Sequence, residues 1–421
     1  MRVLLISQYF FPEVGATQTR MMEFARALTD AGHEVDVLTE FPNHPAGVIP
    51  DSYKGRWIEF DRSLPFRVVR VWVAASRRKT FRTRLQFYGS FVGMAIAASV
   101  RLPRRYDVVA ATSPPLPVAL AGSIIARLKR AAFVMDVRDL WPLAAGALNE
   151  LSNPRVYRWA ERLEQRLYRS ADRITVTTRA FERHIGAQDA RRVGKLVYVP
   201  NGTVERVFDP AAGDNGVRAR LGLEHRFVVT YAGLHGVAQG LSTVLAAAER
   251  LKAHPQVHFL FVGEGPLKNA LQTEARRRQL SSVTFHSQVP LEESVWYLNA
   301  SDALLVPLTP DPVFRMFVPS KLFDSMACAK PVLLSVDGEA RELLEDAKAG
   351  IFVPPGDAER LADSILRLAA DPAGCEKMGR NGRDYVLRNY RRSEQARHFA
   401  AVVADAAAAA GVASVGRTRN V

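Results

Sequence analysis

Cysteine is scarce in this sequence, which contains only Cys328 and Cys375 among its 421 residues. Two cysteines cannot build a disulfide framework, and no cysteine or histidine spacing is typical of a zinc site. The sequence therefore predicts a protein of the reducing cytoplasm without a structural metal.

A hydrophobic run long enough to span a bilayer is also lacking. The apolar stretch at residues 85–100 is shorter than the roughly 20 residues that a transmembrane helix requires. The first seven residues resemble the opening of a signal peptide, but their apolar run ends at Gln8, before a loop with Pro12 and Gly15. We therefore expect residues 2–7 to form a buried strand.

Acidic residues are few in the first half of the chain, where positive charge is concentrated. Residues 1–200 contain 31 Lys and Arg but 18 Asp and Glu, whereas the remaining residues contain 26 and 25. Such an excess attracts an anionic partner, and nucleic acid, an anionic membrane and a phosphorylated acceptor all qualify. No nucleic-acid recognition motif is recognisable, and basic residues are interleaved with aromatics only near residues 77–91, so we expect no nucleic acid as partner.

One segment indicates which anionic partner is involved. Five cations, which we call the basic collar, precede an aromatic and apolar run with helical spacing. A basic collar next to an apolar helix is typical of a segment in a membrane interface. The alternative is a core helix behind a solvated loop; we favour it for residues 92–100, and membrane contact for the collar and its phenylalanines. The basic collar consists of Arg77, Arg78, Lys79, Arg82 and Arg84, and its phenylalanines are Phe81 and Phe87.

Strand-like and helix-like segments alternate along the chain in two blocks. This alternation predicts two α/β domains, each with a parallel sheet covered by helices on both faces. We expect the first domain at 1–205, the second at 206–388, a helix at 389–410 and a disordered tail at 411–421. The expected strands are 2–7, 34–39, 68–73, 108–111, 132–136, 173–176 and 196–199, then 227–231, 258–262, 283–286, 303–306, 332–335 and 351–353.

The most informative stretch is a loop, a helix and a strand around Pro319, a residue suited to the first position of a helix. The backbone N–H groups of Ser320, Lys321 and Leu322 are expected at the helix start, where they and the Lys321 ammonium favour an anion. Asp324 follows one turn later, beside the same ligand. This arrangement suits a phosphate at the helix start and a ribose diol at Asp324. The alternative is an ordinary surface helix that leads into a core strand.

Two further strand–loop–helix units carry special residues at the strand ends. The strand at 257–262 runs into a tight turn between Gly263 and Gly265, and the strand at 227–231 runs into a loop after Gly233. Open α/β sheets bring backbone close to a nucleotide at the carboxyl ends of their strands. Three such units favour a shared ligand site over three coincidences.

Together these segments resemble the family 4 glycosyltransferases of the two-domain GT-B fold, and more narrowly the bacterial WbuB/WcaI type that builds exopolysaccharide or O-antigen. The resemblance covers nearly the whole chain, in order and in spacing. It implies two Rossmann-like domains that face each other across a cleft, with a C-terminal helix that crosses back to the first domain. The motifs that carry it lie at residues 8–15, 112–115, 136–142, 199–202, 231–241, 263–267 and 319–324.

The activity implied by the resemblance is transfer of a sugar, with retention of anomeric configuration, from a nucleotide diphosphate sugar to a lipid-linked glycan acceptor. The donor is expected to be UDP-linked, with an N-acetylated amino sugar as one candidate, and the acceptor a polyprenyl diphosphate in cell-surface polysaccharide biosynthesis. No cofactor and no metal is expected, and the protein is placed in the cytoplasm, peripherally on the inner face of the cell membrane. The alternatives are a nucleotide-sugar 2-epimerase of the GT-B fold and a catalytically inactive nucleotide-sugar-binding protein.

The resemblance also assigns the donor site. Asp324 takes the place of the family's second glutamate, which binds the ribose. The phosphates are expected at the helix start with Ser320, Lys321 and Leu322, and the nucleoside beside the turn with Gly263 and Glu264. The backbone at Gln288 and Val289 is expected to read the uracil edge, and the glycine loop with Gly15 to lie near the sugar or phosphates.

Three positions depart from the family pattern. The first glutamate of the E-x7-E motif falls at Met316, which leaves Arg315 as the nearest polar residue for the donor sugar. The basic residues expected after Gly233 are missing, and His235 and Gln239 stand in that loop.

The third departure is Arg138, which replaces the histidine after the fifth strand of the first domain. Arg138, Lys321 and Arg315 are expected to balance the charge of the leaving diphosphate, with His235 as a further contributor. Asp139 is the acidic candidate for orienting the acceptor or the donor sugar, and Asp136 is the alternative, unless either is paired with Arg138. Glu13 is a weaker candidate for the acceptor hydroxyl.

Overall fold

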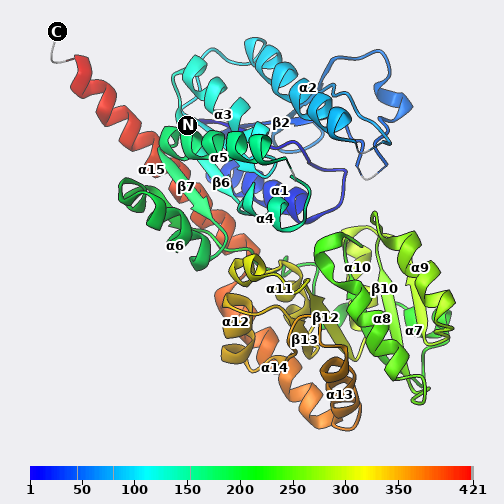
Figure 1. Cartoon of the computed structure of the whole chain (residues 1–421). Helices are drawn as coiled ribbons and strands as arrows, with labels where there is room; N and C mark the ends of the chain where they lie inside the picture. Colours follow the sequence, from blue (N-terminus) through cyan, green and yellow to red (C-terminus); the bar gives the residue numbers. More distant parts are fainter. Residues whose placement is uncertain (45, 79, 152, 419–421) are drawn as a thin grey trace. The chain divides into compact units, whose positions relative to one another are not determined.

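The computed structural model describes residues 1–44, 46–78, 80–151 and 153–418, with all of their side chains except those of residues 81 and 412–418. The chain divides into two compact units (Figure 1): the first unit is Met1–Pro200 with Ser393–Val421, and the second unit is Asn201–Arg392. Each unit is an α/β domain with one mainly parallel sheet, which confirms the predicted fold class. None of the described helices is long and apolar enough to cross a membrane.

The sheet of the first unit has β1 (Arg2–Ile6) near its centre, with Val3 to Ile6 almost wholly buried. The strand order is β3-β4-β2-β1-β5-β6-β7-β8, and neighbours pair in parallel except β3 with β4. A strand covered on both faces needs a near-continuous apolar sequence, which β1 has and the edge strand β3 lacks. The other strands are β2 (Glu34–Glu40), β3 (Ile58–Asp61), β4 (Arg67–Val71), β5 (Val108–Ser113), β6 (Ala132–Val137), β7 (Arg173–Val176) and β8 (Leu196–Tyr198).

Helices cover both faces of this sheet. On one face α1 (Ala16–Asp30) and α15 (Arg392–Thr418) pack on β1, β2, β5 and β6, and the rings of Phe24 and Phe399 stack with centroids 3.8 Å apart. On the other face α3 (Leu116–Lys129) packs on β5 and β6 and contacts both α2 (Phe81–Val100) and α5 (Pro154–Ser170). The shorter helices are α4 (Leu143–Ala147) and α6 (Arg179–Gln188).

The boundary between the units differs from the one predicted from the sequence. The first unit ends at Pro200 rather than at residue 205, because Thr203 is bonded to the end of the second unit. Its N–H donates to Tyr390 O (2.9 Å), and its carbonyl accepts from Arg392 N (2.8 Å). The helix α15 groups with the first unit and continues to Thr418, beyond the expected end at residue 410, and no proline interrupts the sequence up to that residue. Residues 419–421 of the expected tail lie outside the described residues.

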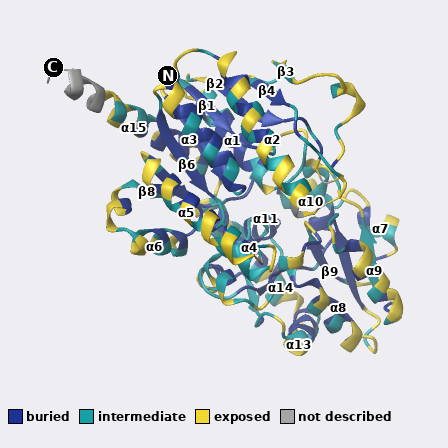
Figure 2. Ribbon diagram, turned by 45° about the horizontal axis from the view of Figure 1, so that its top comes forward, coloured by how far each residue is buried: buried dark blue, intermediate teal, exposed yellow. Residues whose placement is uncertain are grey.

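The second unit has a six-stranded parallel sheet with the order β11-β10-β9-β12-β13-β14, and Figure 2 shows several of its strands among the most buried parts of this unit. The order reverses between β9 (Phe227–Ala232) and β12 (Ala303–Pro307), and open α/β sheets bind ligands outside the carboxyl ends of the strands at such a point. The other strands are β10 (Val257–Val262), β11 (Val283–His286), β13 (Val332–Ser335) and β14 (Gly350–Phe352). The helices are α7 (Val217–Leu221), α8 (Leu241–Arg250), α9 (Lys268–Arg277), α10 (Leu291–Asn299), α11 (Lys321–Ala327), α12 (Glu339–Ala347), α13 (Ala358–Ala369) and α14 (Pro372–Asn389).

Candidate active site

Lys321, the first residue of α11, lies at the carboxyl end of β9. Its Nζ donates to Tyr231 Oη (2.8 Å) and to Gln239 Oε1 (3.0 Å), and it lies 4.1 Å from the centroid of the Tyr231 ring. Desolvation lowers the pKa of Lys321 to about 7. These oxygen partners are neutral, so the amine can bind an anionic ligand and become fully charged in doing so.

Tyr231 is the residue of this cluster that the sequence did not single out. Its hydroxyl lies 2.6 Å from Leu234 O and 3.2 Å from Gln239 Oε1, so it ties Lys321 to the loop after β9. A tyrosine at the end of an otherwise apolar strand was the available signal. The structure thus brings two of the predicted donor residues, Lys321 and Gln239, into direct contact, and Tyr231 bonds to both.

The start of α11 differs from the prediction. Pro319 precedes the helix, and Leu322 N donates to Pro319 O (3.0 Å) while Phe323 N donates to Ser320 O (3.1 Å). The Leu322 amide is therefore used within a tight turn of the chain and is not available to a phosphate. This turn removes one of the three expected amides, and the Lys321 side chain is the charged anion contact offered here.

The glycines at the ends of β9 and β10 allow two loops to touch. A Cβ on Gly263 would lie 2.0 Å from Gly233 O, and a Cβ on Gly265 would lie 2.5 Å from His235 O. The loops are joined by hydrogen bonds from His235 N to Glu264 O (2.8 Å) and from Leu267 N to His235 O (3.0 Å). Close approach of backbone to backbone therefore explains these glycines without any ligand.

Substituting Gly263 should damage this loop pair. Gly263→Ala places a Cβ against Gly233 O at a backbone φ of 145°, so we expect the free energy of unfolding to fall by about 2 kcal/mol or more. Gly32→Ala is the matched control, because Gly32 also has positive φ (79°) but no atom within 4 Å of the new Cβ; its cost should be about 1 kcal/mol. Urea unfolding measures both, and equal losses would contradict the loop contact.

His235 is wholly buried and cannot contribute positive charge to a ligand. Its ring lies among Tyr231, Phe261 and Phe285, with centroids 5.8, 6.2 and 6.1 Å away. Burial, together with the positive charge of Lys268, lowers the pKa of His235 to about 4. The expectation that this imidazole balances a diphosphate is therefore wrong, because the ring is neutral near pH 7 and enclosed by aromatic residues.

Glu264 is engaged by a cation that the sequence argument missed. Lys268, at the start of α9, donates from Nζ to Glu264 Oε1 (2.6 Å) and to His286 O (3.1 Å). Glu264 lies in the turn before α9, and its separation of four residues from Lys268 was the available signal. The pair fixes the turn after β10 to the end of β11, next to the segment with Gln288 and Val289.

Asp324 is half-buried and faces the segment that opens the second unit. Burial raises the pKa of Asp324 to about 6, and the charge of Arg392 and the amide of Val204 oppose that rise. Its Oδ1 accepts no hydrogen bond within the described part of the chain. This oxygen is buried, so it could accept from a ribose hydroxyl only if the ligand reached it; the unpaired oxygen suits the predicted role but does not require it.

Arg315 and Val289 lie in settings that the sequence did not predict. Arg315 is exposed and forms an ion pair with Asp337 (Nη2–Oδ2, 3.0 Å), so its charge is shared with a neighbouring carboxylate. Val289 packs beside the apolar cluster that contains Leu260 and Tyr297, and Gln288 is exposed. The Arg315 side chain is therefore held by Asp337 in the second unit, and its predicted contact with the donor sugar stays a prediction.

In the first unit, Arg138 joins the carboxyl ends of two strands to the start of α1. Its Nε donates to Thr112 Oγ1 (2.7 Å), and its terminal nitrogens donate to Thr17 Oγ1 and to Pro114 O. Burial lowers its pKa, opposed by Asp139 and Asp136. Arg138 is thus brought close to Gly15, which caps α1, and three of its donors are used to hold the loops in place.

The structure separates the two acidic candidates in this unit. Asp136 is bound by the buried Arg20, with Nη2–Oδ1 at 2.8 Å and Nε–Oδ2 at 3.1 Å, and it also accepts from Thr175 Oγ1 (2.7 Å). It is therefore a structural residue, paired with Arg20 rather than with Arg138. Asp139 keeps its place as a candidate: burial raises its pKa, and the Arg138 charge opposes this rise.

Glu13 holds a loop with one carboxylate oxygen, while its other oxygen accepts no hydrogen bond in the described part of the chain. Its Oε1 accepts from the amides of Asn43 and His44, both at 2.8 Å, while its buried Oε2 has no partner in the described residues. Burial raises its pKa. This leaves Glu13 as a loop anchor that can still accept one hydroxyl.

The basic collar leads into α2. Arg77, Arg78 and Arg82 are exposed, and Arg84 pairs with Glu150 (3.2 Å), which lies just before α5. Phe87 is half-buried beside Tyr88. Lys79 and the side chain of Phe81 lie outside the described residues. In the described part of the chain, no group of three or more histidine, cysteine or acidic side chains could hold a metal ion.

Comparison with known proteins identifies the family of this chain. Residues 15–202 match the glycosyl transferase 4-like domain, and residues 226–371 match the glycosyl transferases group 1. The chain belongs to the family 4 glycosyltransferases with the GT-B fold, as its sequence motifs predicted.

Two similar proteins come from bacteria. WbjE of Pseudomonas aeruginosa, named as a glycosyltransferase, is 27% identical over 309 residues, which cover 71% of this chain and 75% of WbjE. WcaI of Escherichia coli strain K12, named as a colanic acid biosynthesis glycosyl transferase, is 24% identical over 415 residues, or 95% of this chain and 98% of WcaI.

Solved structures share the fold along nearly the whole chain. The sucrose-phosphate synthase of Thermosynechococcus elongatus has a TM-score of 0.77 at 22% identity and covers 97% of this chain and 99% of its own. HepE of Anabaena, solved with UDP and glucose, has a TM-score of 0.71 at 17% identity and covers 96% and 99%.

Proposed function

We propose that this glycosyltransferase moves a sugar from a UDP-sugar to a lipid-linked glycan acceptor, with retention of anomeric configuration and without a metal, in the assembly of a cell-surface polysaccharide. The observation that carries the proposal is the desolvated Lys321 amine, held by Tyr231 and Gln239 at the carboxyl end of β9. Two comparisons support it: HepE was solved with UDP-glucose, and WcaI is named for colanic acid biosynthesis.

The chemical step suits these residues. The bond between the anomeric carbon and the donor phosphate oxygen breaks, the acceptor hydroxyl oxygen bonds to that carbon, and its proton leaves with the diphosphate. Negative charge grows on the departing diphosphate, and a preorganised cation stabilises that growth most in a desolvated site. In the proposal Lys321 supplies this cation, Asp324 accepts from the ribose, and Asp139 orients a sugar hydroxyl in the first unit.

The direct test uses the full chain with a panel of UDP-sugars, with and without a polyprenyl diphosphate glycan. Transfer with an unchanged anomeric configuration by NMR supports the proposal. Release of an epimerised donor would show a 2-epimerase instead, and UDP-sugar binding without turnover would show a binding protein. An inverted product would overturn the retaining step alone.

Replacing Asp324 should weaken nucleotide binding. Asp324→Asn removes a charged acceptor worth about 1.5–3 kcal/mol, so the UDP dissociation constant should rise roughly 10- to 100-fold. Because the pKa of Asp324 is raised to about 6, the native carboxylate is protonated below that pH. UDP affinity should therefore fall more steeply as the pH drops through 6 in the native protein than in Asp324→Asn, in which only the terminal phosphate of UDP is protonated. Calorimetry with the exposed Asp363→Asn as control measures this, and an unchanged affinity would remove Asp324 from the site.

A further inference from the structure

The outward sides of α2, α3 and α5 form one surface of the first unit, because α3 contacts both α2 and α5 on the same face of the sheet. We call it the outer helical face. Each helix presents apolar side chains on it that are largely exposed: Leu85 (63%) and Val100 (79%) from α2, Leu128 (62%) from α3 and Trp159 (57%) from α5. Gly89, Gly93 and Ala97 of α2 are exposed between the first two. The expectation that residues 92–100 form a core helix therefore holds for only one side of α2.

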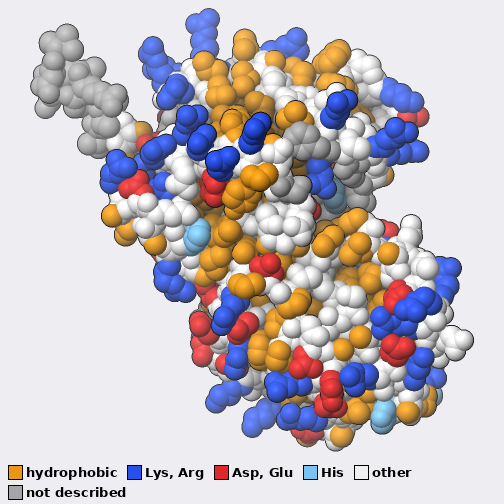
Figure 3. All heavy atoms as spheres, in the orientation of Figure 1, with side chains coloured by type: hydrophobic (Ala, Val, Ile, Leu, Met, Phe, Trp, Pro, Cys, Tyr) orange, Lys and Arg blue, Asp and Glu red, His pale blue; other side chains and the backbone are white. Residues whose placement is uncertain are grey.

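This face is rich in arginine and poor in acidic residues. The helices α2 and α3 contain no Asp or Glu, and of the two glutamates in α5, Glu164 is buried and bonded to Tyr168 Oη (2.9 Å). The apolar stretch of α2 is flanked at both ends by cations. In Figure 3 hydrophobic side chains gather among those of Lys and Arg on the part of this unit that faces the viewer, with few Asp or Glu between them. These cations are Arg77, Arg78, Arg82 and Arg84 on one side and Arg101, Arg104 and Arg105 on the other.

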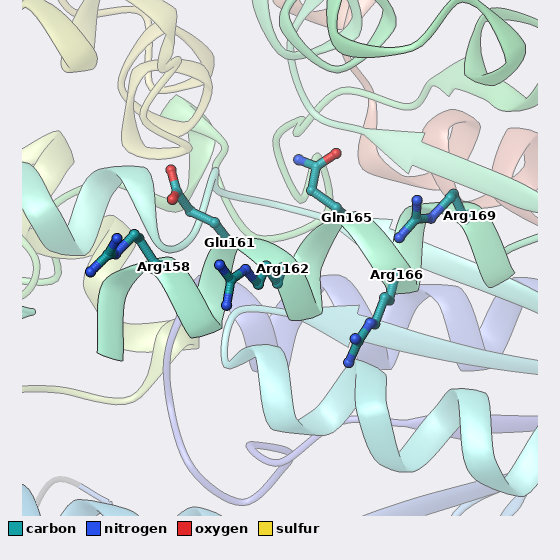
Figure 4. Close-up of a pocket in the computed structure, with 6 residues that line it drawn as sticks. All are labelled: Arg158, Glu161, Arg162, Gln165, Arg166 and Arg169. Atoms are coloured by element: carbon teal, nitrogen blue, oxygen red, sulfur yellow. The ribbon is translucent and has the colours of Figure 1, made fainter. Parts of the chain in front are cut away.

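The arginines of α5 form a hollow of their own. Successive turns of the helix carry them along one side, where they line a hollow of about 470 Å³ together with one glutamate and one glutamine (Figure 4). Like charges one turn apart weaken a helix, so this row lowers the stability of α5 rather than raising it. An arrangement that costs stability indicates a binding role. The lining residues are Arg158, Glu161, Arg162, Gln165, Arg166 and Arg169.

We propose that the outer helical face rests on an anionic lipid bilayer. The aliphatic side chains of α2 and α3 enter the boundary between headgroups and acyl chains, and the arginines of α5 and of the collar bind lipid phosphates. Charge complementarity selects this occupant, because arginines surround aliphatic side chains with few carboxylates between them. The inference rests on the proposed lipid-linked acceptor, which is confined to a membrane, and it extends the contact from the collar to α3 and α5.

Two other occupants fit this face less well. Nucleic acid could use the arginines and stack a base on Trp159 of α5, but it would leave the exposed aliphatic side chains of α2 and α3 without a partner. A protein partner is expected to meet large aromatic anchors near the centre of an interface, and Trp159 is such a residue but belongs to α5. The centre of α2 instead presents Gly89, Gly93 and Ala97, which suit shallow insertion along a fluid surface.

The test is co-sedimentation of the full chain with vesicles of phosphatidylcholine alone and of phosphatidylcholine with phosphatidylglycerol. We expect binding to the anionic vesicles only, reduced at high salt. Arg158→Ser, Arg162→Ser and Arg166→Ser combined should reduce the partition coefficient about 100-fold. Leu85→Ser with Val100→Ser should reduce it about tenfold while leaving the charge unchanged.

A matched variant separates this face from net charge. Arg276→Ser, Arg367→Ser and Arg388→Ser remove the same charge from exposed positions of the second unit and should leave binding within about twofold. The proposal is overturned if the native chain ignores anionic vesicles, or if this control loses as much binding as the α5 variant. It is also overturned if the chain forms a dimer that the α5 variant breaks, because the face would then bind a second copy.

Activity in solution keeps this inference distinct from the proposed function. With a short-chain, water-soluble acceptor the α5 variant should transfer sugar at the native rate, because none of its residues is placed in the donor or acceptor site. Vesicle binding without any transfer by the native chain would remove the proposed function and its lipid-linked acceptor, and would leave the lipid-binding face. Transfer by a native chain that does not bind vesicles would remove the lipid-binding face and would leave the proposed sugar transfer.

Discussion

Replacing Lys321 with methionine should lower kcat/KM for sugar transfer about 100- to 1000-fold. Removing one preorganised group that stabilises growing charge has an effect of that order. The loss should fall mainly on kcat, because the charge on the diphosphate is greatest in the transition state. Methionine keeps most of the apolar stem, but it loses the charged contact of Nζ with the Tyr231 ring as well as the charge offered to the diphosphate. Steady-state kinetics with a soluble acceptor measures the change.

The same amine predicts the pH dependence of the reaction. The pKa of Lys321 is lowered to about 7, so the free enzyme carries the ammonium below that pH and loses it above. For the native protein, kcat/KM should therefore fall as the pH rises through 7. Lys321→Arg keeps a charge at every accessible pH and should show no such fall, although its different shape lowers the rate.

A nearby lysine supplies the control for this experiment. Lys268 is in the same sheet region, but its charge is already paired with Glu264. Lys268→Met leaves the Lys321 amine in place, so the fall of kcat/KM as the pH rises through 7 should remain, whatever the variant does to the turn at Glu264. If Lys321→Met retains native activity, or if its pH profile matches that of the native protein, Lys321 has no catalytic role.

The fold could be predicted well from the sequence, because the strands are marked by local apolar runs. The expected strand at 227–231 is observed as Phe227–Ala232, and that at 332–335 as Val332–Ser335. The strand β3 was not predicted, since Ile58–Asp61 is short, carries charged residues and is held by antiparallel pairing with β4. Apolar runs mark even the edge strands β8, β11 and β14, and among the described strands only the short edge strand with charged residues, β3, was missed.

The candidate site was predicted less completely, because its contacts join distant parts of the chain. The sequence pattern around Lys321 indicated an anion contact, but not that Tyr231, 90 positions away, would hold the amine. The glycine turn at Gly263 suggested a nucleotide contact, whereas loop-to-loop packing already requires it. His235 looked like a polar loop residue, and its burial among aromatic rings depends on the tertiary structure.

The buried pair of Arg20 and Asp136 should be the most costly to break. Arg20 is fully enclosed, and besides Asp136 it donates to Val199 O (2.9 Å) and Pro200 O (3.1 Å), so it fixes the end of the first unit to α1 and β6. Asp136→Ala leaves this guanidinium without its carboxylate. We expect the free energy of unfolding of the first unit to fall by about 3–5 kcal/mol, measured by urea denaturation.

The controls for this prediction test its electrostatic cause. Arg341→Ala breaks an exposed pair with Glu345 and should cost at most about 1 kcal/mol. Replacing both buried partners, by Arg20→Met with Asp136→Leu, leaves no uncompensated charge, so this double variant should be more stable than Asp136→Ala alone. If the two replacements instead add their separate costs, the residues contribute through packing and backbone contacts rather than through their mutual charge.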